Sequence, residues 1–224
     1  MAPLTLALPK GRMQDDALDL IRAVGYRVDE STIGRRLIFQ DESGALRFIL
    51  AKPSDVPIYV EYGAADLGVV GEDTLRECGR EVYEPLALGF GRCRLALAGP
   101  PSARGRNLRR ESGVRVASKY PNLTREYFQG LGIAAEVIPL SGSVELGPAV
   151  GLADLLVDLV ESGRTLRENG LVVLETIMES QAVLIVNHAS HKLRFGAIQD
   201  LIGRLAAELA RREEAARARE AVRA

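Results

Sequence analysis

The chain has 224 residues, of which 47% are hydrophobic and 26% are charged, a composition typical of a globular protein with room for one large domain or two lobes. Its 29 basic and 30 acidic residues leave a formal net charge of -1, which does not favour a nucleic-acid-binding protein. The N-terminal segment has no basic stretch followed by a long apolar run, and no run approaches the roughly 18 apolar residues that span a membrane, so we expect a soluble cytoplasmic protein.

The first half of the chain alternates short β-branched or leucine-rich runs with amphipathic stretches, which predicts an α/β fold. Residues 4–8 form the first expected strand, and a helix follows that ends at Gly25. A hairpin is expected to join 36–39 to 47–50 through the polar turn at 41–44. The other expected elements of this half are a short helix at 55–62, a strand at 66–70 and a glycine-containing strand at 86–100 that crosses between two lobes.

The second half continues the alternation of strands and helices. The expected elements are strands at 114–118, 135–139, 155–160, 171–177 and 182–186, and helices at 123–130, from Thr165 onward and at 200–219. We expect the last two strands to return to the first lobe. The end of the last helix is rich in arginine and glutamate, which favours a solvated face or a partner contact over a core position.

Cysteine and histidine usage argues against several kinds of site. Cys78 and Cys93 are too few for a disulfide framework or a structural metal site. His188 and His191, the two histidines, fit a polar turn after a strand better than a metal site or a histidine-based triad.

One eight-residue segment occurs twice in similar form. Residues 63–70 (Gly-Ala-Ala-Asp-Leu-Gly-Val-Val) match residues 151–158 (Gly-Leu-Ala-Asp-Leu-Leu-Val-Asp) at five of eight positions. Each copy lies where a helix ends in glycine and a strand begins. This indicates two lobes of similar construction and resembles the two-lobed periplasmic-binding-protein type of fold, in which a ligand lies in the cleft between the lobes near helix N-termini.

The segment 155–165 carries the strongest functional signal. A hydrophobic strand leads into Glu161-Ser162-Gly163-Arg164-Thr165, a small-residue turn that opens a helix. Backbone N–H groups and hydroxyls of such a turn can surround a phosphate, and the helix dipole adds attraction. We expect Thr165 to serve as both helix cap and phosphate ligand. The alternative is an ordinary helix cap. Asp154, Asp158 and Glu161 favour the phosphate hypothesis, because acids around a phosphate suggest ribose hydroxyls or a metal ion.

The loop resembles the diphosphoribosyl-binding loop of phosphoribosyltransferases, but Leu159 stands where most of these enzymes have a second acid. A longer series of segments resembles the ATP phosphoribosyltransferase family, which catalyses the first step of histidine biosynthesis. These segments are 142–148, 151–154, 158–166, 8–12, 55–61, 63–71 and 119–124. The resemblance covers roughly residues 4–190.

The resemblance implies an α/β, two-lobed periplasmic-binding-protein type II-like fold with a ligand cleft between the lobes. Lobe I is expected to contain residues 1–90 plus 178–224, and lobe II residues 91–177 with the phosphoribosyl diphosphate loop. The length leaves no room for a C-terminal regulatory domain, so the chain resembles the short form of the family. That form implies a separate regulatory subunit similar to histidyl-tRNA synthetase and a homodimeric core within a hetero-oligomer, with no nucleic acid and no membrane.

The family joins N1 of ATP to C1 of phosphoribosyl diphosphate and releases diphosphate, with Mg²⁺ carried mainly by the substrate phosphates. The resemblance implies that phosphoribosyl diphosphate contacts Glu145, Asp154, Asp158, Glu161, Ser162, Gly163, Arg164 and Thr165. It implies that ATP or diphosphate contacts Lys10, Gly11, Arg12, Arg35, Arg36, Lys52, Glu72 and Asp73. We expect only one of Arg35 and Arg36 to reach the diphosphates, and a helix cap is the simpler interpretation for Asp73.

No side chain is needed as a nucleophile, because the attacking atom belongs to ATP. Catalysis is expected to depend on alignment and charge neutralisation, with Asp154, Asp158 and Arg36 as the catalytic candidates. Three alternatives stay open from the sequence. They are a two-lobed binding protein without catalysis, a phosphoribosyltransferase with another base as acceptor, and a structural partner of an enzyme.

Overall fold

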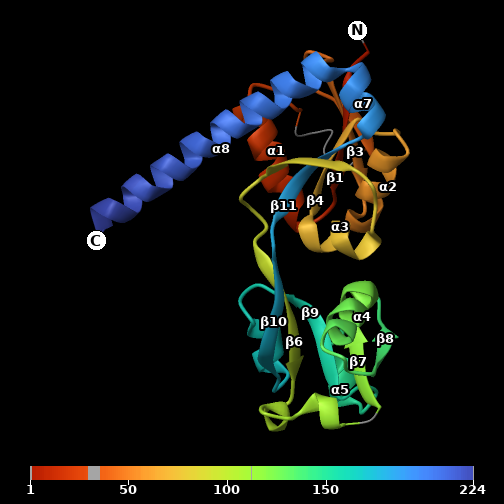
Figure 1. The fold of residues 1–224 in the computed structure, drawn as a ribbon. Helices are drawn as coiled ribbons and strands as arrows, with labels where there is room; N and C mark the ends of the chain where they lie inside the picture. The colour runs from red at the N-terminus through yellow and green to blue at the C-terminus, as the bar shows by residue number, and fades with distance from the viewer. Residues whose placement is uncertain (1, 30–35, 112, 224) are drawn as a thin grey trace. The chain divides into compact units, whose positions relative to one another are not determined.

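The computed structural model describes residues 2–29, 36–111 and 113–223. The chain forms two compact units (Figure 1). Unit 1 contains Met1–Leu75, Gly79–Gly91 and Gln181–Ala224, and unit 2 contains Arg76–Cys78 and Arg92–Ser180. The main chain therefore enters unit 2 after Gly91 and leaves it after Ser180.

Unit 1 is built on a six-stranded sheet whose centre is parallel. In spatial order the strands are β2 (Ile38–Gln40), β3 (Leu46–Ala51), β1 (Leu4–Pro9), β4 (Leu67–Gly71), β11 (Ala182–Val186) and β5 (Tyr83–Ala87). Strands β3, β1 and β4 run parallel, while β2, paired with β3, and β11, paired with β4 and β5, are antiparallel to their neighbours. The central strands β1, β4 and β11 are buried along their whole length, which explains their continuous apolar sequence.

Five helices accompany this sheet among the described residues. They are α1 (Arg12–Ala23), α2 (Val56–Glu61, preceded by the 3-10 turn Pro53–Asp55), α3 (Glu72–Cys78, whose last three residues belong to unit 2), α7 (His188–Leu193) and α8 (Phe195–Arg223). Helices α1, α2 and α8 pack against its strands. Helices α1 and α8 share one core with β1, in which Leu18 and Ile21 of α1 and Leu201 and Leu205 of α8 are buried. Helix α2 lies against β4 so closely that a Cβ at Gly68 would come within 2.8 Å of Val56 and Val60.

Unit 2 is built on a five-stranded mixed sheet. In spatial order its strands are β10 (Val172–Ser180), β6 (Cys93–Gly99), β9 (Leu155–Val160), β7 (Val114–Ser118) and β8 (Ala135–Pro139). Strands β9, β7 and β8 run parallel, and β6 is antiparallel to both β9 and β10. Its helices are α4 (Pro121–Gly130), α5 (Leu146–Ala149) and α6 (Arg164–Glu168).

The alternation of side chains along β9 divides the core of unit 2 between the two faces of the sheet. Leu155 and Val157 belong to a cluster with Phe128 of α4. Leu156 and Val160 belong to a second cluster with Leu166 of α6. Helix α4 therefore covers one face of the sheet, and the segments around α5 and α6 cover the other.

Two expectations about strands were wrong. The single crossing strand at 86–100 is two strands, β5 in unit 1 and β6 in unit 2, because Gly89 and Gly91 adopt positive φ angles of 74° and 64° that end one strand before the next begins. Of the two late strands expected to return to the first lobe, only β11 does so. Strand β10 pairs with β6 in unit 2.

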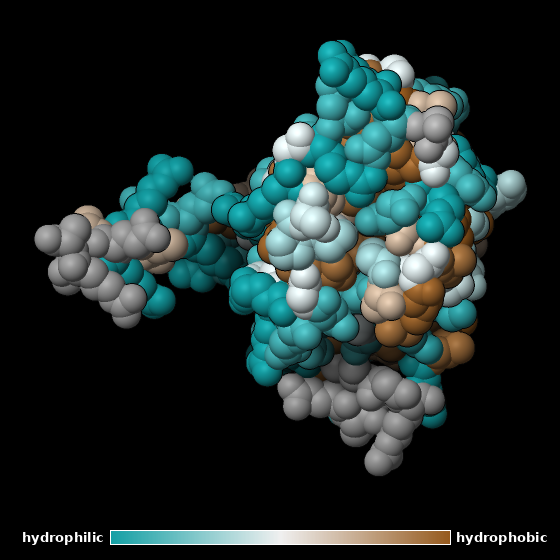
Figure 2. Space-filling view, turned by 90° about the horizontal axis from the view of Figure 1, so that it is seen from below, coloured by the Kyte–Doolittle hydropathy of each residue, from teal (hydrophilic) through white to brown (hydrophobic). Residues whose placement is uncertain are grey.

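Helix α8 extends beyond the part that packs in the core of unit 1 (Figure 1). From Ala210 to Arg219 every side chain is exposed, and the coloured part of the projecting helix is mostly hydrophilic in Figure 2. Ion pairs one turn apart, such as Arg212–Glu208 at 2.7 Å and Arg217–Glu213 at 3.7 Å, support it. No helix among the described residues is long and apolar enough to cross a membrane.

Candidate functional site

The carboxyl ends of the parallel strands of unit 1 bring predicted site residues to one edge of its sheet. Pro9 of β1 lies opposite Ala51 of β3, and each strand is followed directly by a lysine. The N–H of Lys10 donates to the carbonyl of Ala51 at 2.8 Å, which fixes the two strand ends together. The side chains of Lys10 and Lys52 are both exposed at this edge.

Four further predicted residues lie at the same edge. Arg36 precedes β2, and the antiparallel register Ile38–Ile49 continues to place it across from Ala51, with an exposed side chain. Glu72 directly follows β4 in the first turn of α3 and is partly exposed. Gly11 and Arg12 begin α1 here, both exposed, and Gly11 has a φ of 99°. Arg35 lies outside the described residues.

Asp73 differs from its neighbours at this edge, because it is only 4% exposed. Its carboxylate accepts a hydrogen bond from the Thr74 hydroxyl at 3.1 Å and lies close to Gly71, where a Cβ would come within 2.4 Å of it. The expected role of Asp73 as the helix cap was wrong, because Gly71 is the N-cap of α3. Asp73 lies instead in the first turn of α3, where the helix dipole favours an acidic group.

The carboxyl ends of β7, β8 and β9 form a second edge, in unit 2. Asp158 lies near the end of β9, half-buried, on the same face as Leu156 and Val160. Val144 and Leu166 belong to the cluster on that face, so the Asp158 side chain is directed toward the segments that precede α5 and α6.

Asp158 is electrostatically linked to two other charged groups. Burial raises its pKa above the ordinary value, a hydrogen bond from the N–H of Leu159 at 2.8 Å lowers it, the carboxylate of Glu145 raises it and the ammonium group of Lys119 lowers it. Glu145 and Lys119 therefore both act on Asp158. Asp158 belongs to β9, while Lys119 and Glu145 lie in the segments that follow β7 and β8 at the same sheet edge.

The loop Glu161–Thr165 follows β9 directly. Gly163 is the N-cap of α6, with a φ of 69° that favours glycine. The loop is fixed by Arg167, whose guanidinium donates to the carbonyl of Ser162 at 3.0 Å. The N–H of Arg164 donates to the Ser162 hydroxyl at 3.4 Å. The first N–H groups of a helix have no backbone partner within it, so this end of α6 also carries the positive end of the helix dipole.

Within this loop the expected role of Thr165 as the helix cap was wrong, because α6 begins at Arg164 and Gly163 caps it. The side chains of Glu161, Ser162 and Thr165 are exposed. That of Arg164 is exposed too, and it pairs with Glu168 one turn along α6 at 2.7 Å.

Asp154 does not join the other predicted residues. It precedes β9, at the amino end of the strand, while the loop lies at the carboxyl end. Its N–H donates to the carbonyl of Arg115 at 2.8 Å, and its carboxylate accepts from the N–H of Arg115 at 2.9 Å and from its guanidinium at 3.5 Å. These bonds fix β9 beside β7. This placement argues against the expected contact of Asp154 with the ribose.

Two residues of the unit 2 edge were missed as site candidates. Lys119 was part of a segment that matches the family, but the sequence alone does not show that it directly follows a parallel strand of the sheet. Ser143 has a φ of 48°, the only positive φ of a non-glycine residue in the described part of the chain. It lies in the turn before Glu145, and such strain is typical of functional loops.

Mg²⁺ can be bound by one or two carboxylates together with substrate phosphates. Asp158 and Glu145 form such a pair of acids. In the described ranges, no three His, Cys, Asp or Glu side chains gather as an all-protein metal site. The donor set therefore fits a metal ion that arrives with phosphate.

The fold and the two edges are typical of α/β proteins that bind phosphorylated ligands. Each unit is an α/β layer structure with charged loops at the carboxyl ends of parallel strands, which is where proteins of this architecture bind ligands. The lysines, arginines and helix N-termini at these edges suit phosphorylated ligands.

Comparisons with known proteins identify the family. The family model described as HisG: ATP phosphoribosyltransferase matches residues 52–207. The ATP phosphoribosyltransferase of Ruminiclostridium cellulolyticum is 50% identical over 211 residues, which cover 93% of this chain and 98% of the relative. That of Caldanaerobacter subterraneus is 51% identical over 203 residues, covering 90% and 95%. The chain belongs to the ATP phosphoribosyltransferase family and catalyses its reaction, the first step of histidine biosynthesis.

Solved structures agree with this assignment. The ATP phosphoribosyl transferase (HisG:HisZ) complex from Thermotoga maritima contains a chain with a TM-score of 0.79 and 33% identity, matched over 93% of this chain and 99% of that one. The periplasmic aliphatic sulphonate binding protein SsuA of Escherichia coli has a TM-score of 0.59 at 12% identity and shares the fold alone. The two-lobed periplasmic-binding-protein type of fold is thereby confirmed.

Proposed function

We propose that the two sheet edges divide the substrates of the reaction between them. The edge of unit 2 binds phosphoribosyl diphosphate, with its 5′-phosphate at the loop Glu161–Thr165 and its ribose at Asp158 and Glu145. The edge of unit 1 binds ATP through Lys10, Arg36 and Lys52. The observation that carries the proposal is the convergence of charged loops at the carboxyl ends of the parallel strands in each unit.

In this proposal the loop of unit 2 binds phosphate through the first N–H groups of α6 and the hydroxyls of Ser162 and Thr165. Gly163 allows the backbone to approach the phosphate closely, since it has no side chain and tolerates its positive φ. The exposed Arg164 adds positive charge at the same end of the helix. Glu161 is the acid nearest the phosphate in sequence and accepts a hydrogen bond from a ribose hydroxyl.

The catalytic step forms the bond from N1 of ATP to C1 of the ribose as the bond from C1 to the diphosphate oxygen breaks. The electron pair of the broken bond leaves with the diphosphate. Asp158 stabilises the positive charge that develops at the ribose, and Arg36 and the lysines neutralise the departing diphosphate. Asp158 and Glu145 would hold a Mg²⁺ ion that arrives with the substrate phosphates, and that ion would add to the neutralisation of the diphosphate.

Glu72, Gly11 and Arg12 complete the proposed ATP side. Glu72 accepts hydrogen bonds from the nucleoside, and Gly11 lets the backbone at the start of α1 approach a phosphate. Arg35 remains a candidate for the diphosphates beside Arg36.

Separate binding measurements test this division. Thr165→Val is expected to weaken phosphoribosyl diphosphate about 10-fold and leave ATP binding unchanged, while Lys10→Met is expected to do the reverse. Thr176→Val, an exposed threonine of β10, and Lys192→Met, an exposed lysine of α7, are the matched controls. Equal losses of both substrates in both site variants would contradict the division.

We also propose that the chain works in the cytoplasm with a separate regulatory subunit similar to histidyl-tRNA synthetase, around a homodimeric core. Support comes from the complex of the Thermotoga maritima relative, named HisG:HisZ, whose matched chain is covered to 99%. Analytical ultracentrifugation with and without that kind of subunit, purified from the same source, tests this. The expected result is a dimer alone and a larger mixed assembly with the subunit. A chain that stays at the same mass in both samples would contradict it.

A further inference from the structure

Lysine is rare in this chain, and its placement is not even. Only four of the 29 basic residues are lysines: Lys10, Lys52, Lys119 and Lys192. The first three share one structural position, because each is the residue directly after a parallel strand, namely β1, β3 and β7. Lys119 thus occupies in unit 2 the position that Lys10 and Lys52 occupy in unit 1.

The sheet register sets Lys119 beside Asp158. Ser118, the last residue of β7, lies opposite Val157 of β9, so the residues that follow them are neighbours along the sheet edge. Electrostatic coupling agrees with this geometry, since the pKa of Asp158 is lowered by Lys119 and raised by Glu145. The side chain of Lys119 is exposed and therefore accessible to a ligand.

A buried hydroxyl fixes the turn that carries Lys119. Ser118 is 0% exposed, and its Oγ donates to the carbonyl of Val157 at 2.8 Å. The same Oγ accepts from the N–H of Tyr120 at 2.9 Å. The neighbours of Lys119 in the chain, Ser118 and Tyr120, are therefore joined by a hydrogen bond through the Ser118 hydroxyl. The same hydroxyl is bonded to Val157, the residue directly before Asp158.

Helix α4 supports this hydroxyl from the other side. Thr124, also 0% exposed, has its Oγ1 2.9 Å from Ser118 Oγ and 2.6 Å from the carbonyl of Tyr120, and its single proton serves one of the two. Buried polar networks of this kind restrict a turn to one conformation.

We propose that Lys119 is a further substrate-binding residue of this reaction, whose ammonium group binds an anionic group of phosphoribosyl diphosphate beside Asp158 and Glu145, and that Ser118 is the positioning residue that holds it there. The proposal rests on the assignment of the unit 2 edge to phosphoribosyl diphosphate. Its chemistry is direct. Two carboxylates at a polyanion site need a cation between them and the substrate, and a fixed ammonium group provides one.

The test compares the binding of phosphoribosyl diphosphate and of ATP, measured separately by calorimetry, in Lys119→Met, Lys119→Arg and the control Lys192→Met. Lys119→Met is expected to weaken phosphoribosyl diphosphate roughly 10- to 100-fold and to leave ATP within a factor of two. Lys119→Arg is expected to recover part of the loss, and Lys192→Met to bind both like the parent. A Lys119→Met protein that binds phosphoribosyl diphosphate like the parent overturns the proposal.

The Thr165→Val variant separates this failure from failure of the underlying assignment. If Thr165→Val loses phosphoribosyl diphosphate and Lys119→Met does not, only the role of Lys119 is wrong. If both variants lose ATP instead, the assignment of the unit 2 edge is wrong.

A double-mutant cycle tests Ser118 as a positioning residue. Ser118→Ala is expected to weaken phosphoribosyl diphosphate several-fold, and to add little further loss in the Lys119→Met background, because it acts through Lys119. Folding is checked by circular dichroism in each variant. A purely structural Ser118 would weaken binding by the same factor in both backgrounds, and that result would overturn the positioning role.

Discussion

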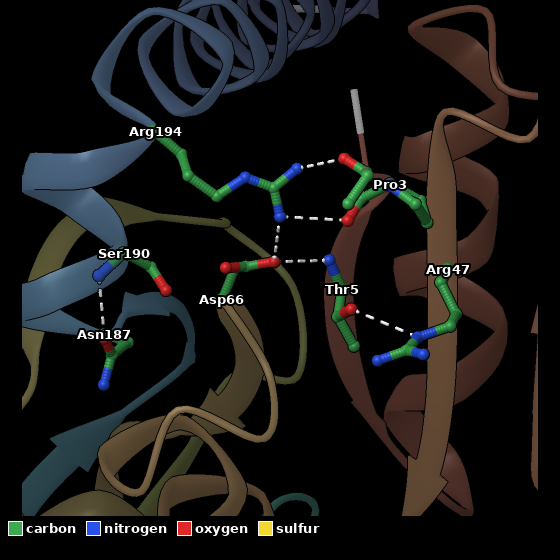
Figure 3. A network of polar contacts seen from close by, with 8 residues as sticks. Pro3, Thr5, Arg47, Asp66, Asn187, Ser190 and Arg194 are labelled. Atoms are coloured by element: carbon green, nitrogen blue, oxygen red, sulfur yellow. Dashed lines mark hydrogen bonds and ion pairs between the residues drawn. The ribbon is translucent and has the colours of Figure 1, made fainter.

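Asp66 in unit 1 and Asp154 in unit 2 occupy the same place in the duplicated segment and make the same backbone contacts. The N–H of Asp66 donates to the carbonyl of Thr5 at 2.8 Å. The N–H of Thr5 donates back to the Asp66 carboxylate at 2.8 Å (Figure 3). Asp154 repeats both bonds with Arg115, at 2.8 and 2.9 Å. Each aspartate joins the start of one parallel strand to its neighbour.

We call each aspartate with its two backbone hydrogen bonds a clamp. The two clamps differ in the arginine with which the aspartate forms an ion pair. The Asp66 side chain is 12% exposed and pairs at 2.8 Å with Arg194, which comes from the segment between α7 and α8. Arg194 also donates to the carbonyls of Pro3 and Ala2, so this clamp ties the two ends of unit 1 together (Figure 3). Asp154 is 34% exposed and pairs at 3.5 Å with Arg115, the residue it already contacts through the backbone.

The aspartate that the two copies of the segment share therefore stabilises the fold and is not part of the proposed substrate site. Both copies act at the amino ends of parallel strands, whereas the candidate substrate residues lie at the carboxyl ends. A motif can therefore recur because two similar sheets need the same strand-joining contact.

The largest expected effect is on unit 1. Asp66→Asn leaves the Arg194 charge without its partner in a largely buried setting, and we expect a loss of about 3 kcal/mol in the free energy of unfolding. Chemical denaturation measures it, with hydrogen exchange at the Thr5 amide as a local probe. The control is Asp200→Asn, since Asp200 is 66% exposed and pairs with Arg204 at 3.5 Å, where about 0.5 kcal/mol or less is expected. Equal losses in the two variants would contradict the account.

The equivalent change in unit 2 is expected to cost less. Asp154→Asn weakens one hydrogen bond from a backbone N–H and an exposed ion pair, and we expect a loss of about 1–2 kcal/mol. The same denaturation experiment, with exchange at the Arg115 amide, checks this. A loss larger than that of Asp66→Asn would reverse the comparison.

The glycines that precede the two clamps are expected to behave alike. Gly63 and Gly151 both have a φ of 72°, and a Cβ would meet only ordinary contact or open space at either position. Alanine at each is therefore expected to cost about 1 kcal/mol through backbone strain alone. Gly203→Ala in α8, where φ is not positive and a Cβ meets nothing within 4 Å, is the control and is expected to gain up to about 1 kcal/mol. Clearly unequal costs at Gly63 and Gly151 would show that the two turns are not equivalent.

The smallest expected effect is a pH dependence of opposite sign at two acids of unit 2. The N–H of Arg115 is the main cause that lowers the pKa of Asp154, so its stabilisation is present above the unfolded pKa of about 3.9 and is lost as the pH falls through the lower folded value. Burial raises the pKa of Asp158, so its ionised form costs stability at neutral pH, and that cost disappears as the pH falls through the raised value. At pH 7, Asp154→Asn is expected to be less stable than the parent and Asp158→Asn more stable. Both differences in stability are expected to shrink as the pH is lowered to 3. Differences of the same sign would contradict this.

Much of the fold was predictable from the sequence because its signals are local. The strand before Pro9, the glycine that ends α1 and the duplicated segment each depend on a few adjacent residues, and the structure confirms all three. The break between β5 and β6 was not predicted, because the run from Leu86 to Pro100 is mostly apolar and periodicity alone does not show where two glycines turn the chain.

The candidate site was predictable in its types of residue more than in its arrangement. The loop around Gly163 and the lysines after Pro9 and Ala51 were found from sequence. Asp154 was assigned to the ribose because it is close to Asp158 in sequence, but Asp154 precedes β9 whereas Asp158 lies in the second half of the strand. Lys119 was missed as a site residue for the converse reason, since only the pairing of β7 with β9 brings it beside Asp158.

The most direct test of the central claim compares two aspartates of unit 2 in one assay. The kcat/KM for phosphoribosyl diphosphate and the midpoint of thermal unfolding are measured for Asp158→Asn and Asp154→Asn. Asp158→Asn is expected to lose activity on the order of 100-fold with no loss of stability, while Asp154→Asn is expected to keep activity within a few-fold and to unfold at lower temperature. An Asp158→Asn enzyme with parental turnover, or an inactive Asp154→Asn enzyme that is fully stable, would contradict it.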